Sequence, residues 1–342
     1  MSPTPSRPTL EQVAARAGVG RGTASRVING GAKVSPRSRE AVEQAIAELG
    51  YVPNPAARAL VKRRTDAVAL VIAESEERVF GEPFFAGVVR GIGAALADAD
   101  RQLVLILAQA DQGSQRRDRL DQYLTRQHVD GVLLLSLHDD DELPERIREH
   151  GLPVVVGGRA SAEVTHGFVD VDNVQGAALA VGHLIERGRQ RIATIAGPRD
   201  MVAGSSRLQG YAAALSDAGR ELDPRLVEHG DFGQDSGAAA MRALLEREPG
   251  LDAVFCANDL MAVGALQALR EAGRRVPEDV AVVGFEDAPI ARSALPPLTT
   301  VHQSSEEMGR AMVDLLLAAV ADPDADQPGR MLTTRLVVRD ST

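Results

Sequence analysis

The stretch TLEQVAARAGVGRGTASRVING, residues 9–30, decides how the start of the chain folds. Its apolar residues recur with a helical period on both sides of Gly18, a residue that commonly ends a helix. We predict two short helices joined by a tight turn, the second from about Arg21 to Asn29. A third helix, starting at Pro36 and ending before Gly50, closes a small bundle. Two helices at a tight turn are the design of a helix-turn-helix DNA-binding unit.

The second helix of this unit carries the side chains suited to DNA. Its apolar positions face the bundle, which leaves Arg21, Gly22, Ser25 and Arg26 pointing outward. Arg21 and Arg26 can each donate two hydrogen bonds to O6 and N7 of a guanine, while the hydroxyls of Thr23 and Ser25 suit phosphate oxygens. The plainer alternative is a surface helical hairpin with no DNA. The predicted contact residues here are Arg21, Gly22, Thr23, Ser25, Arg26 and Asn29.

Charge divides the chain into a basic head and an acidic body. Residues 1–64 hold 11 Lys and Arg against 4 acidic residues, whereas the remainder holds 27 against 44. A basic module joined to an acidic body is typical of a nucleic-acid-binding arm on a domain with another task. A solvated charge fluctuation is the alternative explanation.

Composition places the whole chain among multi-domain globular proteins. Its 342 residues are 44% apolar, and no apolar run approaches the roughly 20 residues that a membrane helix needs. The first ten residues contain no apolar stretch of signal-peptide length, and the single Cys256 cannot form an intramolecular disulfide. We therefore expect a cytoplasmic protein that does not contact a membrane.

From Ala67 onward, short apolar runs alternate with helical stretches in two successive sets. Continuous apolar strands between helices predict parallel sheets that are covered on both faces, and hence two similar α/β lobes. Ligands in such folds bind beyond the carboxyl ends of the strands. The predicted strands are residues 68–73, 103–107, 132–135 and 154–156, then 191–196, 226–229, 253–256 and 280–285; the helices lie near 84–99, 115–127, 142–149, 173–187, 205–218, 234–246 and 259–272.

The head, including AGVGRGTASRVING and AELGYVPNPAARAL, resembles the lactose-repressor/galactose-repressor (LacI/GalR) family of bacterial transcription regulators. The resemblance implies that the second motif is a hinge helix that orders on operator DNA. It also implies that Leu60 enters the minor groove at a central CG step, with Asn54 and Ala57 beside it. Unstacking one step bends the duplex, which makes a leucine wedge physically sensible. Packing of Leu60 against the body is the alternative.

Two glycines depart from the family pattern. Gly20 stands where members commonly have a serine that caps the second helix, so this cap is weaker. Gly22 stands at a position that usually contacts a base. We expect Arg21 and Arg26 to carry most of the major-groove specificity.

The body resembles the core of the same family through EPFFAGVVRGI, FCANDLMAVGAL, VAVVGFEDAPIA and PPLTTV. The resemblance implies a two-lobed core like that of periplasmic sugar-binding proteins, with three crossings of the chain between lobes. The expected organisation is a disordered tail (1–8), a helix-turn-helix domain (9–50), a hinge helix and linker (51–65) and a core (66–342). Lobe 1 is expected at about 66–162 and 303–330, and lobe 2 at about 163–302 and 331–342.

The resemblance also places an effector between the lobes. Arg207 matches an arginine that donates to sugar hydroxyls or a purine. The alternative is that Arg207 or Glu286 belongs to an ion pair on the surface of its lobe. Glu286 replaces the usual ligand-binding aspartate, and Phe232 offers a platform for a ring. One of Phe84 and Phe85 is expected in the core. The full predicted ligand set is Phe84, Phe85, Arg159, Arg207, Phe232, Asn258 and Glu286.

These observations predict an allosteric repressor that is not an enzyme. The sequence has none of the common nucleotide-binding, serine-hydrolase or zinc-protease motifs, and its seven histidines lack metal-ligand spacing. We expect no cofactor or metal. A sugar-binding transport protein and a DNA-regulated enzyme are the less favoured classes.

The expected partners are double-stranded operator DNA, a second copy of the chain and a small molecule. A neutral mono- or oligosaccharide inducer is favoured, with a nucleobase corepressor or a phosphoprotein partner as alternatives. The resemblance implies that tetramers of the family use a leucine-heptad tail after the core; this sequence shows no heptad repeat before Thr342, so a homodimer is the expected assembly. Such a regulator would act at the nucleoid of the bacterial cytoplasm.

Overall fold

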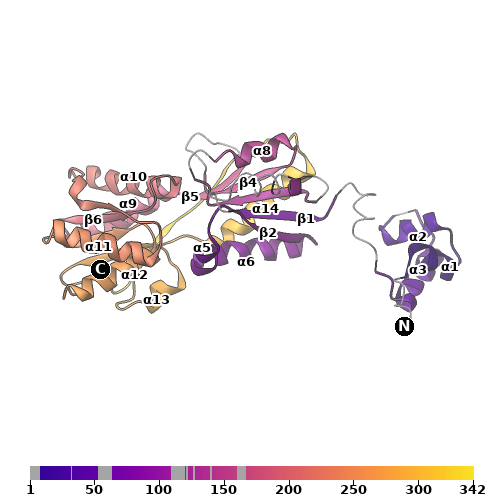
Figure 1. Ribbon diagram of the computed structural model, residues 1–342, viewed down its shortest axis with the longest axis horizontal. Coiled ribbons are helices and arrows are strands. Elements are labelled where there is room, and N and C mark those ends of the chain that lie inside the picture. The colour runs from indigo at the N-terminus through magenta and orange to yellow at the C-terminus, as the bar shows by residue number, and fades with distance from the viewer. Residues whose placement is uncertain are drawn as a thin grey trace. The chain divides into compact units, whose positions relative to one another are not determined.

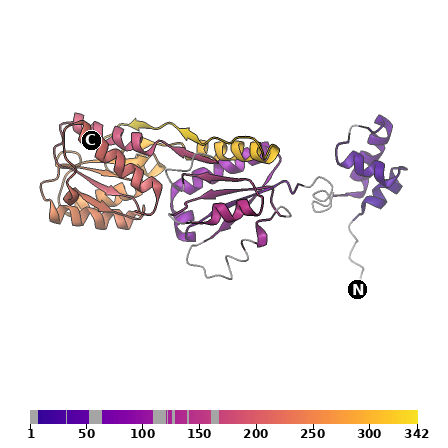
Figure 2. The ribbon, with the colours of Figure 1, turned by 90° about the horizontal axis from the view of Figure 1, so that it is seen from above.

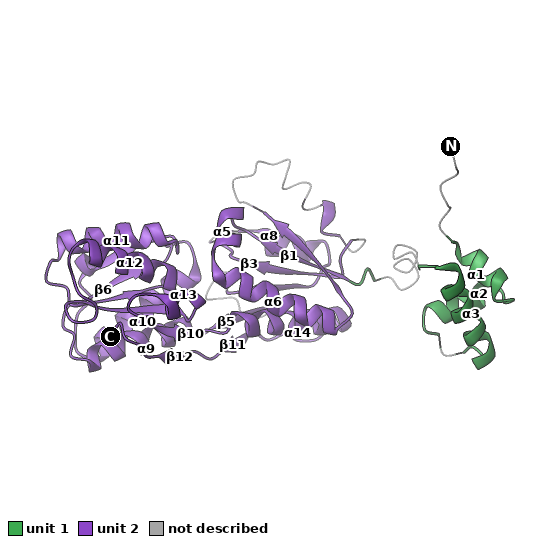
Figure 3. Ribbon diagram, turned by 90° about the horizontal axis from the view of Figure 1, so that it is seen from below, with its two compact units in different colours: residues 1–66 green, residues 67–342 purple. Residues whose placement is uncertain are grey.

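The computed structural model describes residues 8–31, 33–52, 64–108, 120, 122–125, 128–138, 141–159 and 167–342. The chain divides into two compact units, residues 1–66 and 67–342 (Figure 3). Asn54, Ala57 and Leu60, and with them the predicted hinge helix, lie outside the described residues, as does most of the helix predicted near 115–127. No helix among the described residues is long and apolar enough to cross a membrane.

The first unit is a three-helix bundle, as predicted. Val13, Ala24 and Val42 are buried at its centre, one from each helix. The first helix begins with a capping box between Thr9 and Gln12, which satisfies backbone N–H groups at its start. The helices are α1 (Leu10–Arg16), α2 (Arg21–Ile28) and α3 (Pro36–Leu49).

The second unit contains two six-stranded sheets, one in each lobe. Neighbouring strands are parallel throughout, except that β12 pairs antiparallel with β10. The order in the first sheet is β11-β5-β4-β3-β1-β2, and in the second β12-β10-β9-β8-β6-β7. The strands are β1 (Ala67–Ile72), β2 (Gln102–Leu107), β3 (Gly131–Leu135), β4 (Val154–Gly157), β5 (Phe168–Val171), β6 (Ile192–Ala196), β7 (Val227–His229), β8 (Ala253–Cys256), β9 (Ala281–Glu286), β10 (Thr299–His302), β11 (Arg330–Leu332) and β12 (Arg335–Val337).

Helices cover the sheets, and nearly every central strand is therefore buried along its whole length. In the second lobe, α9 and α10 lie on one face of the sheet and α11 and α12 on the other (Figure 1). This architecture confirms the predicted fold class. The helices are α5 (Glu76–Gly81), α6 (Pro83–Asp98), α8 (Leu143–Glu149), α9 (Asn173–Glu186), α10 (Val202–Asp217), α11 (Gln234–Arg247), α12 (Asp259–Glu271), α13 (Pro289–Ser293) and α14 (Ser305–Ala321).

The chain crosses between the lobes three times: after β5, after β10 and between β11 and β12. Figure 2 shows the yellow C-terminal segment passing from one lobe to the other. The predicted lobe boundary at 162/163 is wrong, because β5 belongs to the first sheet and the first crossing follows Val171. The predicted boundary at 330/331 falls inside β11 and moves to after Leu332. Both strands are short, and the buried Asp170 interrupts the apolar run of β5.

A close contact between α6 and α14 fixes the second crossing against the first lobe. A Cβ on Gly91 would lie 2.0 Å from the carbonyl oxygen of Glu306, and one on Gly87 would lie 2.0 Å from Oγ of Ser305. Only glycine allows this approach. The contact places the start of α14, and Gln303 just before it, beside the start of α6.

Candidate functional site

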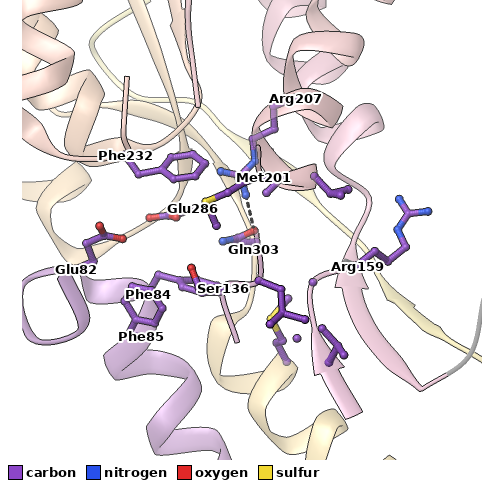
Figure 4. Close-up of a pocket in the computed structure, with 17 residues that line it drawn as sticks. Glu82, Phe84, Phe85, Ser136, Arg159, Met201, Arg207, Phe232, Glu286 and Gln303 are labelled. Carbon is purple, nitrogen blue, oxygen red and sulfur yellow. Dashed lines mark hydrogen bonds between the residues drawn. The ribbon is translucent and has the colours of Figure 1, made fainter. Parts of the chain in front are cut away.

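A cavity of about 730 Å³, partly open to solvent, lies between the two lobes. Residues at the start of α6, after β3, β4 and β7, at the end of β9 and on α10 line it (Figure 4). The carboxyl ends of parallel strands thus meet at the cavity, as expected for an α/β fold. Six of the seven predicted ligand residues line this cavity: Phe84, Phe85, Arg159, Arg207, Phe232 and Glu286.

The side chain of Arg207 is the most constrained group at the cavity. The residue is only 4% exposed, and three of its N–H groups donate hydrogen bonds within the protein. Nε donates to Oδ1 of Asn173 at 2.8 Å, Nη1 to the carbonyl oxygen of Ala257 at 2.6 Å and Nη2 to Oε1 of Gln303 at 3.2 Å. Its guanidinium also stacks 3.8 Å from the ring centroid of Phe285. Arg207 is therefore a buried, oriented donor and not half of a surface ion pair.

Burial shifts the pKa values of Arg207 and Glu286 toward each other. It lowers the pKa of Arg207 to about 10, so the guanidinium stays charged at neutral pH. It raises the pKa of Glu286 to about 8 against the opposing charge of Arg207, so the carboxyl group is mostly protonated at pH 7. A protonated carboxyl group both donates and accepts hydrogen bonds.

Three residues beside the cavity have left-handed backbone conformations. The φ angles are 113° at Glu286, the last residue of β9, and 70° at Phe232 and 60° at Ser136, which lie after β7 and β3. Such conformations are unfavourable for residues with a Cβ and persist only where the surroundings enforce them. They direct these side chains toward the space between the lobes.

Asn258 is the predicted ligand residue that the structure does not place at the cavity. Asn258 is 1% exposed and does not line the cavity. Its Oδ1 accepts from the backbone N–H of Met261 and caps α12, while its Nδ2 donates to the carbonyl oxygen of Phe232 at 2.8 Å. The amide therefore holds the turn that presents Phe232. The ring of Phe232 packs closely over Gly197, where a Cβ would lie 2.5 Å from Cζ.

The wall of the first lobe begins with two aromatic rings in edge contact, 5.4 Å apart between centroids. Phe85 is 2% exposed and belongs to the core, whereas Phe84 is partly exposed. Arg159 donates from Nε to Oδ2 of Asp170 at 3.2 Å, and Figure 4 shows its guanidinium directed away from Glu286. Asp170 also accepts from Nδ2 of Asn173. A buried polar chain therefore links Arg159 to Arg207.

Sequence reasoning missed Gln303 and the acidic end of the cavity. Glu82 and Ser136 line that end (Figure 4). Arg78 donates to Glu82 at 2.7 Å and to Glu74 at 2.6 Å, and burial raises the pKa of Glu82. Ser136 donates to Glu74 at 2.6 Å. The polar run AESEE directly after β1 was a usable signal, since ligands bind where strands end.

One hydrogen bond joins the rims of the two lobes. His138, just after β3, contacts Oδ2 of Asp200, just after β6, with 2.8 Å between Nδ1 and the carboxylate oxygen. The two residues belong to different sheets. The separation of the lobes and this contact are therefore coupled.

On α2, Arg21, Gly22 and Arg26 are exposed as predicted, whereas Ser25, which was also expected to point outward, is partly buried. Nε of Arg21 lies 3.0 Å from Oε1 of Glu11 on α1. A Cβ on Gly22 would lie 3.8 Å from Nη2 of Arg26, so the guanidinium of Arg26 lies over the first turn of the helix.

The other three predicted contact residues of α2 are less exposed. Thr23 and Ser25 are half-buried beside the arginines. Asn29 follows the last residue of the helix, and its Nδ2 donates to the carbonyl oxygen of Ser25 at 2.9 Å. The side chain of Asn29 therefore closes the helix end.

A helix-turn-helix unit on a two-lobed α/β core with a cavity between its lobes defines a DNA-binding transcription regulator. Two family models match the chain: bacterial regulatory proteins, lacI family, over residues 9–54, and periplasmic binding protein-like domain over residues 181–342. The HTH-type transcriptional regulator CelR of Thermobifida fusca is 56% identical over 337 residues, which are 98% of each chain. The chain belongs to the LacI family, which confirms the resemblance.

Solved structures agree with this assignment. A transcriptional regulator CelR–cellobiose complex is 54% identical with a TM-score of 0.77, covering 98% of this chain and 100% of that one. The lac repressor dimer bound to operator and the anti-inducer ONPF is 29% identical with a TM-score of 0.87, covering 98% and 99%. The members of this family are transcription regulators.

Proposed function

We propose that this chain is a homodimeric repressor in the bacterial cytoplasm, released from its operator by a short β-linked glucose oligosaccharide. Cellobiose is the first ligand to test, because a relative 54% identical to this chain is described as a complex with it. The observation that carries the proposal is that the buried guanidinium of Arg207, held by three hydrogen bonds, and the carboxyl group of Glu286 line one cavity. The chain is proposed to have no catalytic activity.

The cavity lining suits a neutral polyol. Arg207 has N–H groups left after its three internal bonds, and the Glu286 carboxyl makes no hydrogen bond to any described side chain. Phe84 and Phe232 offer apolar surface to the faces of sugar rings. Polar groups stand at both ends, with Gln303 near Arg207 and Glu82 opposite.

The effector would act through the separation of the lobes. A ligand that contacts both lobes stabilises the arrangement in which its contacts are complete, and it shifts the population by its differential affinity for the two arrangements. In a dimer, lobe movement would change the spacing of the paired DNA heads. The family resemblance also supports Leu60 as the wedge at a central CG step of a pseudo-palindromic operator.

Operator release tests this function directly. Purified full-length protein is titrated onto fluorescent promoter DNA, and cellobiose, ribose, cytidine and purine bases are then added separately. Cellobiose alone is expected to lower the anisotropy toward that of free DNA. Tightening by a purine while every sugar is inert would reject the inducer and favour corepression. Failure to bind any promoter fragment would reject the repressor itself.

Glu286→Gln is expected to flatten the pH dependence of the core's thermal stability. The pKa of Glu286 is about 8 in the folded protein against an ordinary value of 4.5, so the folded state keeps a proton that the unfolded state has lost. Stability therefore falls as pH rises from about 5 to 8. Glutamine has no such proton. Asp259, whose burial raises its pKa to about 7, gives both proteins a residual slope in the same direction.

Melting temperatures at pH 5.5 and pH 8 measure this effect. The wild type is expected to lose several degrees more than the variant over that interval. Equal losses in the two proteins would contradict a raised pKa at Glu286.

A further inference from the structure

A second cavity of about 740 Å³ adjoins the one between the lobes. It lies between the start of α6, the segment from Glu286 to α13, and the crossing that leads into α14. Phe84, Glu286 and Gln303 line both cavities. These three side chains therefore lie where the two cavities meet. They supply an aromatic ring, a carboxyl group and an amide, which are the kinds of group that suit a sugar ring in the first cavity.

The second cavity is polar, and its buried charge is already compensated. Burial would raise the pKa of Asp287, but the hydrogen bond and charge of Arg339 lower it below its usual value. Arg339 donates to Asp287 at 2.5 Å, and Nδ1 of His302 lies 3.1 Å from the same carboxylate. The ionised Asp287 is thus paired without any ligand. A bound cation is therefore not needed to balance the charge of Asp287.

Two arginines give this cavity donors that a ligand could use. Arg292 on α13 has a 69% exposed side chain, and its Nη2 lies 3.7 Å from Asp287, beyond ordinary hydrogen-bond distance. Arg90 on α6 is exposed and belongs to the opposite lobe. Ser304 and Ser305 add hydroxyl-bearing side chains from the crossing. The lining thus presents hydroxyl-binding groups from both lobes.

We propose that the second cavity is an extension subsite for the third and later rings of a β-linked glucan whose first two rings occupy the first cavity. This inference rests on the proposed function, because it assumes that a disaccharide binds between the lobes. A longer chain would pass between Phe84 and Gln303 and reach Arg292. The regulator would then sense oligosaccharide length as well as sugar identity.

Calorimetry of the full chain with cellobiose and cellotriose tests the subsite. Wild-type protein is expected to bind cellotriose about fivefold more tightly than cellobiose, the gain from about one net hydrogen bond. Arg292→Ala is expected to remove this gain and leave cellobiose affinity within about twofold, because Arg292 does not line the first cavity. Arg90→Ala repeats the test from the other lobe. Arg270→Ala, an exposed arginine on α12 that lines neither cavity, is the matched control.

The outcomes separate the two proposals. Equal affinities for the two sugars in wild-type protein would overturn the subsite while leaving the sugar-responsive repressor in place. An equal loss of both sugars in Arg292→Ala would also overturn it, since the arginine would then act on the whole cleft. If neither sugar binds wild-type protein that still binds its operator, the proposed effector fails and the subsite fails with it.

Discussion

Arg207→Ala is expected to abolish effector binding and leave operator affinity unchanged, so that the variant represses without responding. The side chain is buried at the cavity and supplies donors in a fixed orientation. Its loss also leaves Oδ1 of Asn173 and the carbonyl oxygen of Ala257 without their donor, which loosens the crossing beside the cavity. The DNA-binding unit is a separate compact unit, so its fold does not depend on this arginine.

Two further variants test whether the planar guanidinium of Arg207, and not merely a positive charge near the cavity, binds the effector. Arg207→Lys keeps the charge but not the planar fork, and we expect it to bind cellobiose far more weakly than wild type does. Arg159→Ala removes an arginine whose guanidinium points away from Glu286, and a smaller loss is expected. Effector titrations by calorimetry, with operator anisotropy in parallel, measure both properties. Wild-type effector affinity in Arg207→Ala would remove this residue from the site.

Arg26→Ala is expected to cost about 1 to 3 kcal/mol of operator binding and to relax specificity at one base pair in each half-site. Arg26 is exposed on α2, and its guanidinium lies beside position 22, where a Cβ would be in ordinary contact with it at 3.8 Å. Competition binding with every single-base substitution of the operator measures the change.

Arg16→Ala provides the matched control for this experiment. Arg16 lies in the last turn of α1 and forms an ion pair with Glu48 on α3, so its removal changes the head's charge equally without touching α2. We expect it to weaken all sequences alike. If Arg26→Ala also weakens every operator variant equally, Arg26 contacts a phosphate and not a base.

The cavity residues that could be predicted from the sequence were charged or aromatic side chains at the ends of predicted apolar strands. Glu286 ends the apolar run of β9, and Phe232 follows β7, so strand position alone directed attention to both. Asn258 also follows a strand, yet its amide caps α12 and holds the carbonyl oxygen of Phe232. A strand end brings a side chain near the cavity, but only the competing local hydrogen bonds decide whether it faces a ligand.

Gln303 shows what the linear sequence could not supply. It lies 96 residues after Arg207, on a crossing whose position depends on the glycine contact between α6 and α14. The acidic end of the cavity is similar, because Ser136 and Glu74 are joined across 62 residues. The first pair depends on the packing of the crossing, and the second forms only when β1 and β3 pair in one sheet. No local sequence pattern records either contact.

The sequence by itself determined the helix-turn-helix head, the two sets of strands and helices, and the family, because helical period, apolar runs and turn residues act over a few neighbouring positions. Tertiary structure decided the lobe boundaries, since a strand as short as β5 is assigned by its neighbour in the sheet and not by its composition. It also decided that Arg207 is buried against Phe285 and that a second cavity shares Phe84, Glu286 and Gln303. Burial and cavity shape depend on contacts between distant segments, which are fixed only once both lobes are packed.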